Sequence, residues 1–140
     1  MIQKTAITLI TAKGELTMEK IETKKAPAAI GPYSQAMKVN GFVFTSGQIP
    51  IDPETGNIEA ATIEEQAEQA IKNLSAVLEA AGTGLDRVVK STCFLQHMSD
   101  FNAFNQVYAK YFPNNPARSC FEVGALPKGA LVEIEVVAEV

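Results

Sequence analysis

The chain has 140 residues, of which 46% are apolar and 20% charged, and a formal net charge of −4. This length and composition are typical of one globular domain that buries its core without disulfides. The negative charge, with Lys24–Lys25 as the longest basic run, disfavours general binding to nucleic acids or anionic membranes, because both require clustered Lys and Arg.

The N-terminal segment MIQKTAITLITAKGELT precedes a second methionine, Met18. Its apolar stretch AITLI is too short for the core of a signal peptide, so we predict no export signal. Residues 1–17 are interpreted as an extension, which is an added strand, a segment before an alternative start at Met18, or a non-native remnant. Residues 18–140 are expected to form one domain.

Turn signals delimit the first strands of this domain. The segment APAAIGPY, residues 26–33, contains two prolines and a glycine and predicts an ordered turn. Asn40-Gly41 between two apolar runs is typical of a hairpin turn. Residues 35–39 and 42–47 are therefore expected to be antiparallel strands.

Two amphipathic helices are predicted further along. Thr62 and Glu65 have the spacing of a capping box, and apolar residues then recur every three or four positions up to Gly82, a C-terminal signal. A second helix is expected from about residue 99 to Pro113, which cannot continue it. Its inner stripe consists of Phe101, Phe104, Val107, Tyr108 and Tyr111. The apolar or alternating segments 87–98, 117–124 and 131–138 are predicted to be strands.

The predicted order of elements is β-β-α-β-α-β-β. This order indicates an α+β sandwich, in which one mixed, mainly antiparallel sheet carries both helices on one face. Because no predicted element is left to cover the other face of the sheet, a partner subunit is expected there.

The strand that begins near residue 117 presents Arg118, Cys120 and Glu122 on one side. If this strand pairs with the last one, Arg118 lies next to Glu133, and a guanidinium can bind a carboxylate with two parallel hydrogen bonds. Spacing alone favours a cross-strand ion pair on a wet sheet face over a binding site for a small anion.

Other chemistries have less support in the sequence. The two cysteines, Cys93 and Cys120, lie in apolar strand-like segments, which is typical of reduced thiols in a cytoplasmic protein. The single histidine, His97, is not expected to activate Cys120, and no Cys/His cluster has the spacing of zinc ligands. TSGQIP is not a phosphate-binding loop, although the backbone at Gly47 allows an anion to approach closely.

Four stretches share the pattern of one protein family. They are APAAIGPYSQA (26–36), FTSGQIPIDPETG (44–56), EAAG (79–82) and PARSCFEVGALPKGALVEIE (116–135). Together they resemble the RidA family, also called YjgF, of reactive-intermediate deaminases, from about Met18 to Val140. The resemblance implies a chorismate mutase-like fold assembled as a homotrimer with clefts between subunits.

The resemblance also implies an activity and the residues that carry it. Family members hydrolyse 2-imino acids such as 2-iminobutanoate and 2-iminopropanoate, and their enamine tautomers, to 2-oxo acids and ammonia without a metal or organic cofactor. Pyridoxal-phosphate-dependent dehydratases release these imines. By match to the family motifs, Arg118 binds the substrate carboxylate, while Glu133 and Tyr33 act on the attacking water. The remaining matches line the cleft and are Ser46, Gly47, Asn105 and Cys120.

Two alternatives remain open at this point. One is endoribonuclease or translation-inhibitor activity, which the negative charge, the single histidine and the lack of aromatic residues with basic neighbours disfavour. The other is a non-catalytic regulatory trimer that binds a small molecule. Such a protein would also need Arg118, but it would have less use for Glu133 and Tyr33.

Overall fold

The computed structural model describes residues 2–11 and 14–140, with side chains from Thr17 onward. The chain forms a seven-stranded sheet with the order β1-β2-β3-β4-β7-β5-β6. The strands are β1 (Ile2–Thr11), β2 (Gly14–Thr23), β3 (Ala36–Val39), β4 (Phe42–Thr45), β5 (Val88–Leu95), β6 (Ala117–Glu122) and β7 (Val132–Glu139). Neighbouring strands are antiparallel except for β5 and β6, which are parallel.

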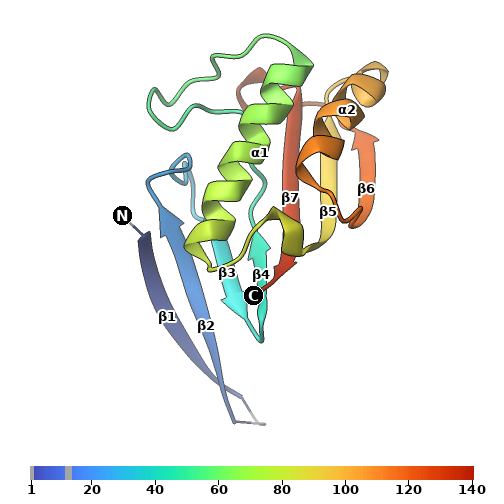
Figure 1. Cartoon of the computed structure of the whole chain (residues 1–140). Coiled ribbons are helices and arrows are strands. Elements are labelled where there is room, and N and C mark those ends of the chain that lie inside the picture. Colours follow the sequence, from blue (N-terminus) through green and yellow to red (C-terminus); the bar gives the residue numbers. More distant parts are fainter. Residues whose placement is uncertain (1, 12–13) are drawn as a thin grey trace.

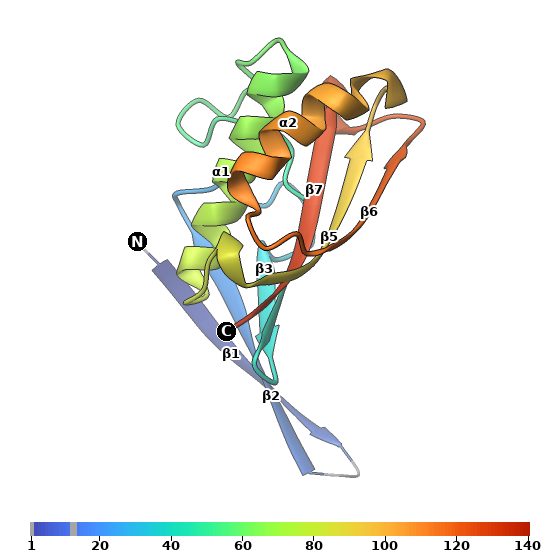
Figure 2. The same ribbon diagram turned by 45° about the vertical axis from the view of Figure 1, so that its right-hand side comes forward.

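Two helices, α1 (Ile63–Ala80) and α2 (Phe101–Tyr111), cover one face of this sheet (Figure 1, Figure 2). Short 3-10 turns lie at Leu85–Arg87, Met98–Asp100 and Pro127–Gly129. The buried side of α1 packs with buried residues of β4, β5 and β7, such as Val43, Cys93 and Val136, into one core. The predicted α+β sandwich, with a mainly antiparallel sheet and both helices on one face, is confirmed.

Local signals account for the ends of these elements. The hydroxyl of Thr62 accepts a hydrogen bond from the backbone N–H of Glu65 at 3.2 Å, which caps α1. Asn40 and Gly41 have φ values of +52° and +80°, as a two-residue hairpin turn requires. β4 ends at Thr45 rather than at residue 47, although the backbone N–H of Ser46 still donates to the carbonyl of Gln35, its register partner across β3.

The first two strands form a long hairpin that the residue pattern did not predict in full. Ile2 lies opposite Thr23, and Thr11 lies opposite Gly14. Within the described residues, β2 pairs with β3 from Glu19 to Ile21, so the hairpin extends beyond the rest of the sheet (Figure 2). The boundary expected between residues 17 and 18 falls inside β2. The division of the chain at this boundary stays a prediction.

The pairing considered for the strands of Arg118 and Glu133 is wrong. β5 lies between β6 and β7, so that Arg118 is opposite Ser91 and Glu133 is opposite Phe94. Hairpin loops usually have two to about five residues, whereas the connection between β6 and β7 is longer and contains a 3-10 turn. It therefore crosses the end of β5 instead of joining adjacent strands.

A buried glutamine fastens the loop that follows β2. Gln35 is 3% exposed, and its Oε1 accepts a hydrogen bond from the backbone N–H of Thr23 at 2.7 Å. Its Nε2 donates to the carbonyls of Thr23 at 3.1 Å and Pro27 at 2.7 Å. This side chain replaces backbone pairing in a proline-containing loop, and thereby holds the segment that leads to Tyr33.

We expect Gln35→Ala to lower the free energy of unfolding by about 2–4 kcal/mol, because it leaves several buried backbone groups without partners. Urea denaturation followed by circular dichroism measures this loss. Gln106→Ala on the exposed side of α2 is the matched control, with an expected change within about 0.5 kcal/mol. A loss below about 1 kcal/mol in Gln35→Ala would contradict this role.

Candidate functional site

Glu133 at the start of β7 lies against the backbone of Gly47. An isolated bridge joins Gln48 and Ile134, with hydrogen bonds of 2.8 and 3.1 Å between their backbone groups. In this antiparallel bridge Gly47 lies diagonally across from Glu133, close enough for the Glu133 side chain to reach it. A Cβ atom on Gly47 would lie 2.3 Å from Oε1 of Glu133, which is far below a van der Waals contact. The absence of a side chain at position 47 therefore makes room for the carboxylate.

Tyr33 and Ser46 flank this carboxylate site. Oγ of Ser46 donates a hydrogen bond to the carbonyl of Ser34 at 2.6 Å, which fixes the segment after Tyr33 to the end of β4. The hydroxyl of Tyr33 accepts from the backbone N–H of Ile30 at 3.3 Å. Tyr33 and Gly47 line one small hollow of about 30 Å³. The structure thus brings together Tyr33, Ser46, Gly47 and Glu133, which we call the carboxylate half-site.

The environment of Glu133 favours its protonated form. Burial raises the pKa of this carboxyl group, and the negative charge of Glu135, two positions along the same strand, raises it further. A glutamate with a raised pKa accepts a proton from water more readily at neutral pH than an exposed one does. Glu133 therefore has the properties of a general base.

Arg118 lies on the other side of the sheet, under α2. The central carbon of its guanidinium is 4.7 Å from the ring centroid of Tyr108, 5.6 Å from that of Phe101 and 5.9 Å from that of Phe104. Tyr108 is itself held by a 2.6 Å hydrogen bond between its hydroxyl and Oγ of Ser91. We call these three rings the aromatic cradle.

The cradle contacts the guanidinium through cation–π interactions, which use the faces of the rings. Among the side chains that the structure describes, no carboxylate forms an ion pair with Arg118. Its N–H groups can therefore donate two parallel hydrogen bonds to the carboxylate of a ligand. The cradle fixes the position of the guanidinium, and the N–H groups of Arg118 remain available to a ligand.

Two further predicted site residues lie on the elements that form this site, Asn105 on α2 and Cys120 on β6. Oδ1 of Asn105 is buried without a hydrogen-bond partner, and its position on α2 follows Phe104 of the cradle. A buried acceptor without a partner is costly, so this atom is well suited to accept a hydrogen bond from a ligand. Cys120 lies two residues beyond Arg118 on the same side of β6. We call Arg118, Asn105 and Cys120 the guanidinium half-site.

Within one chain the two half-sites lie on opposite faces of the sheet. Ser91, the register partner of Arg118, is buried beside Tyr108 on the helix-covered face. Phe94, the register partner of Glu133, packs edge to face with Phe121 on the other face, with ring centroids 5.2 Å apart. The seven predicted site residues thus form two groups on opposite faces of the sheet.

Sequence reasoning missed the aromatic cradle. Phe101, Phe104 and Tyr108 have ordinary helical spacing and were assigned only to the inner stripe of α2. The available signal was Tyr108, because a tyrosine within an apolar stripe needs a partner for its hydroxyl. Ser91, the partner that the structure shows, comes from a strand 17 residues away.

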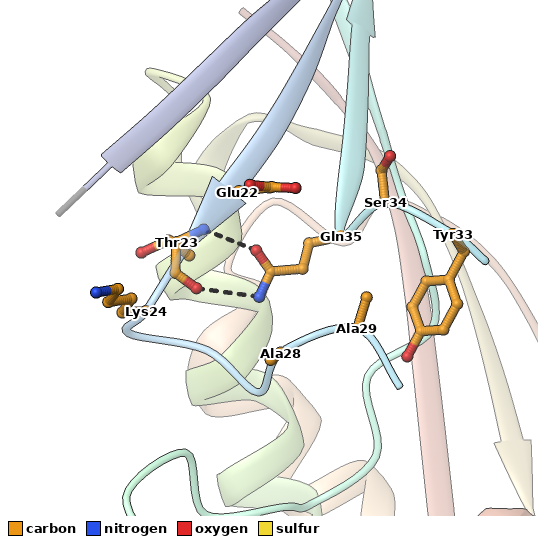
Figure 3. Close-up of a pocket in the computed structure, with 8 residues that line it drawn as sticks. All are labelled: Glu22, Thr23, Lys24, Ala28, Ala29, Tyr33, Ser34 and Gln35. Carbon is orange, nitrogen blue, oxygen red and sulfur yellow. Dashed lines mark hydrogen bonds between the residues drawn. The ribbon is translucent and has the colours of Figure 1, made fainter. Parts of the chain in front are cut away.

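A larger hollow of about 300 Å³ lies beside Tyr33 and Gln35 (Figure 3). Figure 3 shows the Gln35 amide in its wall, hydrogen-bonded to the backbone of Thr23. Neither Gly47 nor Glu133 lines this hollow. Within the described residues, no group of three or more His, Cys, Asp or Glu side chains is arranged to bind a metal ion. None of the helices in the described part is long and apolar enough to cross a membrane.

A family model described as Endoribonuclease L-PSP matches residues 23–140. The chain belongs to this family, the RidA (YjgF) family. The RidA relative RutC family protein y4sK of Sinorhizobium fredii is 54% identical over 121 residues, which cover 86% of this chain and 96% of that protein. The human 2-iminobutanoate/2-iminopropanoate deaminase is 49% identical over 119 residues, or 84% of this chain and 87% of that protein.

The RidA fold is also found in solved structures. The crystal structure of E. coli TdcF with bound serine has a TM-score of 0.83 and 42% identity, and the match covers 86% of this chain and 98% of that chain. The resemblance deduced from the four sequence stretches is therefore confirmed. A relative named as an imine deaminase supports the general class of deaminating hydrolase. The description of the family model names a different activity, that of an endoribonuclease.

Proposed function

We propose that this protein hydrolyses 2-imino acids and their enamine tautomers, such as 2-iminobutanoate and 2-iminopropanoate, to 2-oxo acids and ammonia. The observation that carries the proposal is the guanidinium of Arg118, which rests on three aromatic rings with no carboxylate partner among the described side chains. An anion of a small organic acid fits this position. The name of the human relative and the serine bound to E. coli TdcF support the choice of substrate.

The same proposal includes a homotrimer in which clefts between subunits join the two half-sites. Large apolar side chains are exposed on the sheet, among them Phe44 at 48% and Phe121 at 44%. They belong to the face that the helices leave open, because Phe44 alternates with the buried Val43 and Thr45. A neighbouring subunit that covers this face could bring its carboxylate half-site to the guanidinium half-site of the first.

In the proposed mechanism, the positions of the substrate and the attacking water matter more than chemical activation of either. An iminium carbon next to a carboxylate is already electrophilic, so the reaction requires no metal or organic cofactor. Arg118 binds the substrate carboxylate, and Tyr33 and Glu133 hold a water near the iminium carbon. As the water oxygen bonds to that carbon, Glu133 accepts a proton. It then returns the proton to the nitrogen. Ammonia leaves as the hydroxyl oxygen gives its proton to Glu133 and forms the carbon–oxygen double bond, and Glu133 passes this proton to the released ammonia.

The other matched residues complete the cleft in this proposal. The buried Oδ1 of Asn105 accepts a hydrogen bond from an N–H group of the substrate, which satisfies an otherwise unpaired acceptor. Glu133 packs against Gly47, beside Ser46, on one side of the cleft, and Cys120 lines the other side. A cytoplasmic location and a supply of imines from pyridoxal-phosphate-dependent dehydratases belong to the same proposal.

A coupled assay tests this function. Threonine dehydratase generates 2-iminobutanoate, and semicarbazide competes with the protein for the imine. We expect the protein to accelerate the release of 2-oxobutanoate and to reduce the yield of semicarbazone. An unchanged yield of semicarbazone would contradict the proposal. A protein that binds 2-oxobutanoate without this effect would instead be a non-catalytic binder.

The pH dependence of kcat/KM should report the raised pKa of Glu133. The rate falls as the pH falls through this pKa, because the protonated carboxyl group cannot accept a proton from water. In Glu135→Gln the neighbouring negative charge is absent, so the pKa of Glu133 is lower and the acid limb of the profile shifts to lower pH. Profiles from about pH 4 to about pH 8 measure the shift.

Glu54→Gln is the control for this prediction, because Glu54 is exposed in a turn far along the chain from β7. Its acid limb should coincide with that of the unmodified protein. An acid limb that does not move in Glu135→Gln, or that moves to higher pH, would show that Glu133 does not control the profile.

Endoribonuclease activity is the second candidate, because the matching family model carries that description. An RNA-cleaving site would need basic side chains along a groove, whereas the chain has a formal net charge of −4. RNA cleavage that persists in Arg118→Ala, together with no effect on the semicarbazone yield, would favour this candidate.

A further inference from the structure

Cys93 and Cys120 lie side by side on the helix-covered face of the sheet. The parallel register of β5 and β6 pairs these two residues directly. Cys93 is fully buried in the core, and Cys120 packs against the same core from the edge strand. Neighbouring strands are about 4.7–4.9 Å apart, and the Cα atoms of disulfide-bonded cysteines are about 4.4–6.8 Å apart. The backbone therefore already holds the two Cα atoms at a spacing that a disulfide tolerates.

The two thiols have different chemical characters. A hydrogen bond from Cys93 lowers the pKa of Cys120 to about 7, and the positive charge of Arg118 also favours the thiolate against the effect of burial. The same hydrogen bond and burial raise the pKa of Cys93. The proton thus stays on the buried sulfur, and the thiolate forms on the sulfur that is partly exposed at the sheet edge. A reactive thiolate beside a second thiol is typical of redox-sensitive cysteine pairs.

We propose that Cys93 and Cys120 are a modification site, at which hydrogen peroxide or another hydroperoxide converts the dithiol into an intramolecular disulfide. The Cys120 thiolate attacks one peroxide oxygen, so that a sulfur–oxygen bond forms and the oxygen–oxygen bond breaks. The departing hydroxide takes a proton and becomes water. The sulfur of Cys93 then displaces the hydroxyl group from Cys120, and that hydroxyl leaves with the Cys93 proton as a second water.

The balance of the reaction is two thiols oxidised to one disulfide and one hydrogen peroxide reduced to two waters. A small dithiol reverses it by thiol–disulfide exchange. The modification site shares Cys120 with the proposed cleft, but neither sulfur acts as a nucleophile in the proposed hydrolysis. Its test therefore uses covalent mass and stands whether or not imine hydrolysis is confirmed.

The experiment treats the native, full-length protein with a small excess of hydrogen peroxide and then blocks free thiols with iodoacetamide. We expect the whole-protein mass to fall by two hydrogens and both cysteines to escape alkylation. Peptide mapping without reduction should show one cross-linked pair that contains Cys93 and Cys120. Dithiothreitol should restore two alkylated cysteines.

Two variants test the separate roles of the sulfurs. In Cys120→Ser the consumption of peroxide by the protein should slow by at least about tenfold, because the remaining thiol is buried and protonated. In Cys93→Ser no disulfide can form, and Cys120 should instead gain oxygen atoms that dithiothreitol does not fully remove. Cys93→Val, which fills the core with an apolar side chain, serves the same purpose if serine impairs folding.

Three results would overturn the proposal. One is accumulation of sulfinic acid at Cys120 in the unmodified protein with no cross-linked peptide. Another is a cross-link only between two chains. The third is oxidation in Cys93→Val that matches the unmodified protein in both rate and reversibility. Circular dichroism before and after treatment checks that the reaction occurred in the folded protein.

Discussion

Replacing Arg118 with alanine is expected to lower kcat/KM for 2-iminobutanoate by about 100-fold or more, which corresponds to about 2.7 kcal/mol of transition-state binding. The variant loses the two-pronged, charge-assisted contact to the substrate carboxylate and with it the orientation of the iminium carbon. Folding should be nearly unaffected, because the guanidinium contributes about 0.5–1 kcal/mol through its contacts with the aromatic cradle. The semicarbazide assay and urea denaturation measure the two effects.

Two further variants make this result specific to the site. Arg118→Lys keeps the charge but loses the planar fork and its stacking on the rings, so its rate should fall between those of the unmodified protein and Arg118→Ala. Arg87→Ala is the matched control, because Arg87 is exposed and pairs with Glu139 at 2.6 Å. Wild-type turnover in Arg118→Ala would refute the proposed role, whatever the behaviour of the lysine variant.

The parts of the fold that the sequence predicted well are those with local signals. Thr62 caps α1 through the N–H of Glu65 only three residues away, and Asn40-Gly41 forms a turn that depends on its own backbone angles. Such features are encoded within a few residues, so a pattern is sufficient to find them. The RidA motifs brought the seven predicted site residues together, whereas the spacing of polar residues alone favoured an ion pair for Arg118.

Features that depend on distant contacts were not predictable in the same way. β5 lies between β6 and β7, and nothing in the residues of β6 specifies that neighbour. β2 has charged residues such as Glu19 and Glu22 among its apolar ones, so the strand pattern is weak until β1 and β3 pair with it. The aromatic cradle is equally non-local, because helical spacing cannot distinguish a core stripe from a platform for Arg118.

Replacing Gly47 with alanine is expected to reduce imine hydrolysis by about 100-fold, because it displaces the carboxylate of Glu133. The new Cβ would lie 2.3 Å from Oε1, 2.8 Å from Cδ and 2.9 Å from Cγ of that residue. These atoms belong to the end of a flexible side chain, which can rotate away without moving the backbone. A displacement of about 1 Å is enough for a loss of this size. The stability cost of such a repacking is about 1–2 kcal/mol.

Gly124→Ala is the matched glycine control, since a Cβ at that position has no neighbour within 4 Å, and it should keep the rate and the stability of the unmodified protein. A double variant separates displacement of Glu133 from other effects at position 47. If Gly47→Ala acts through Glu133, then adding Glu133→Gln should slow the reaction little further, because both changes remove the same interaction. Multiplicative losses in the double variant, or wild-type turnover in Gly47→Ala, would show that Glu133 does not act from its place beside Gly47.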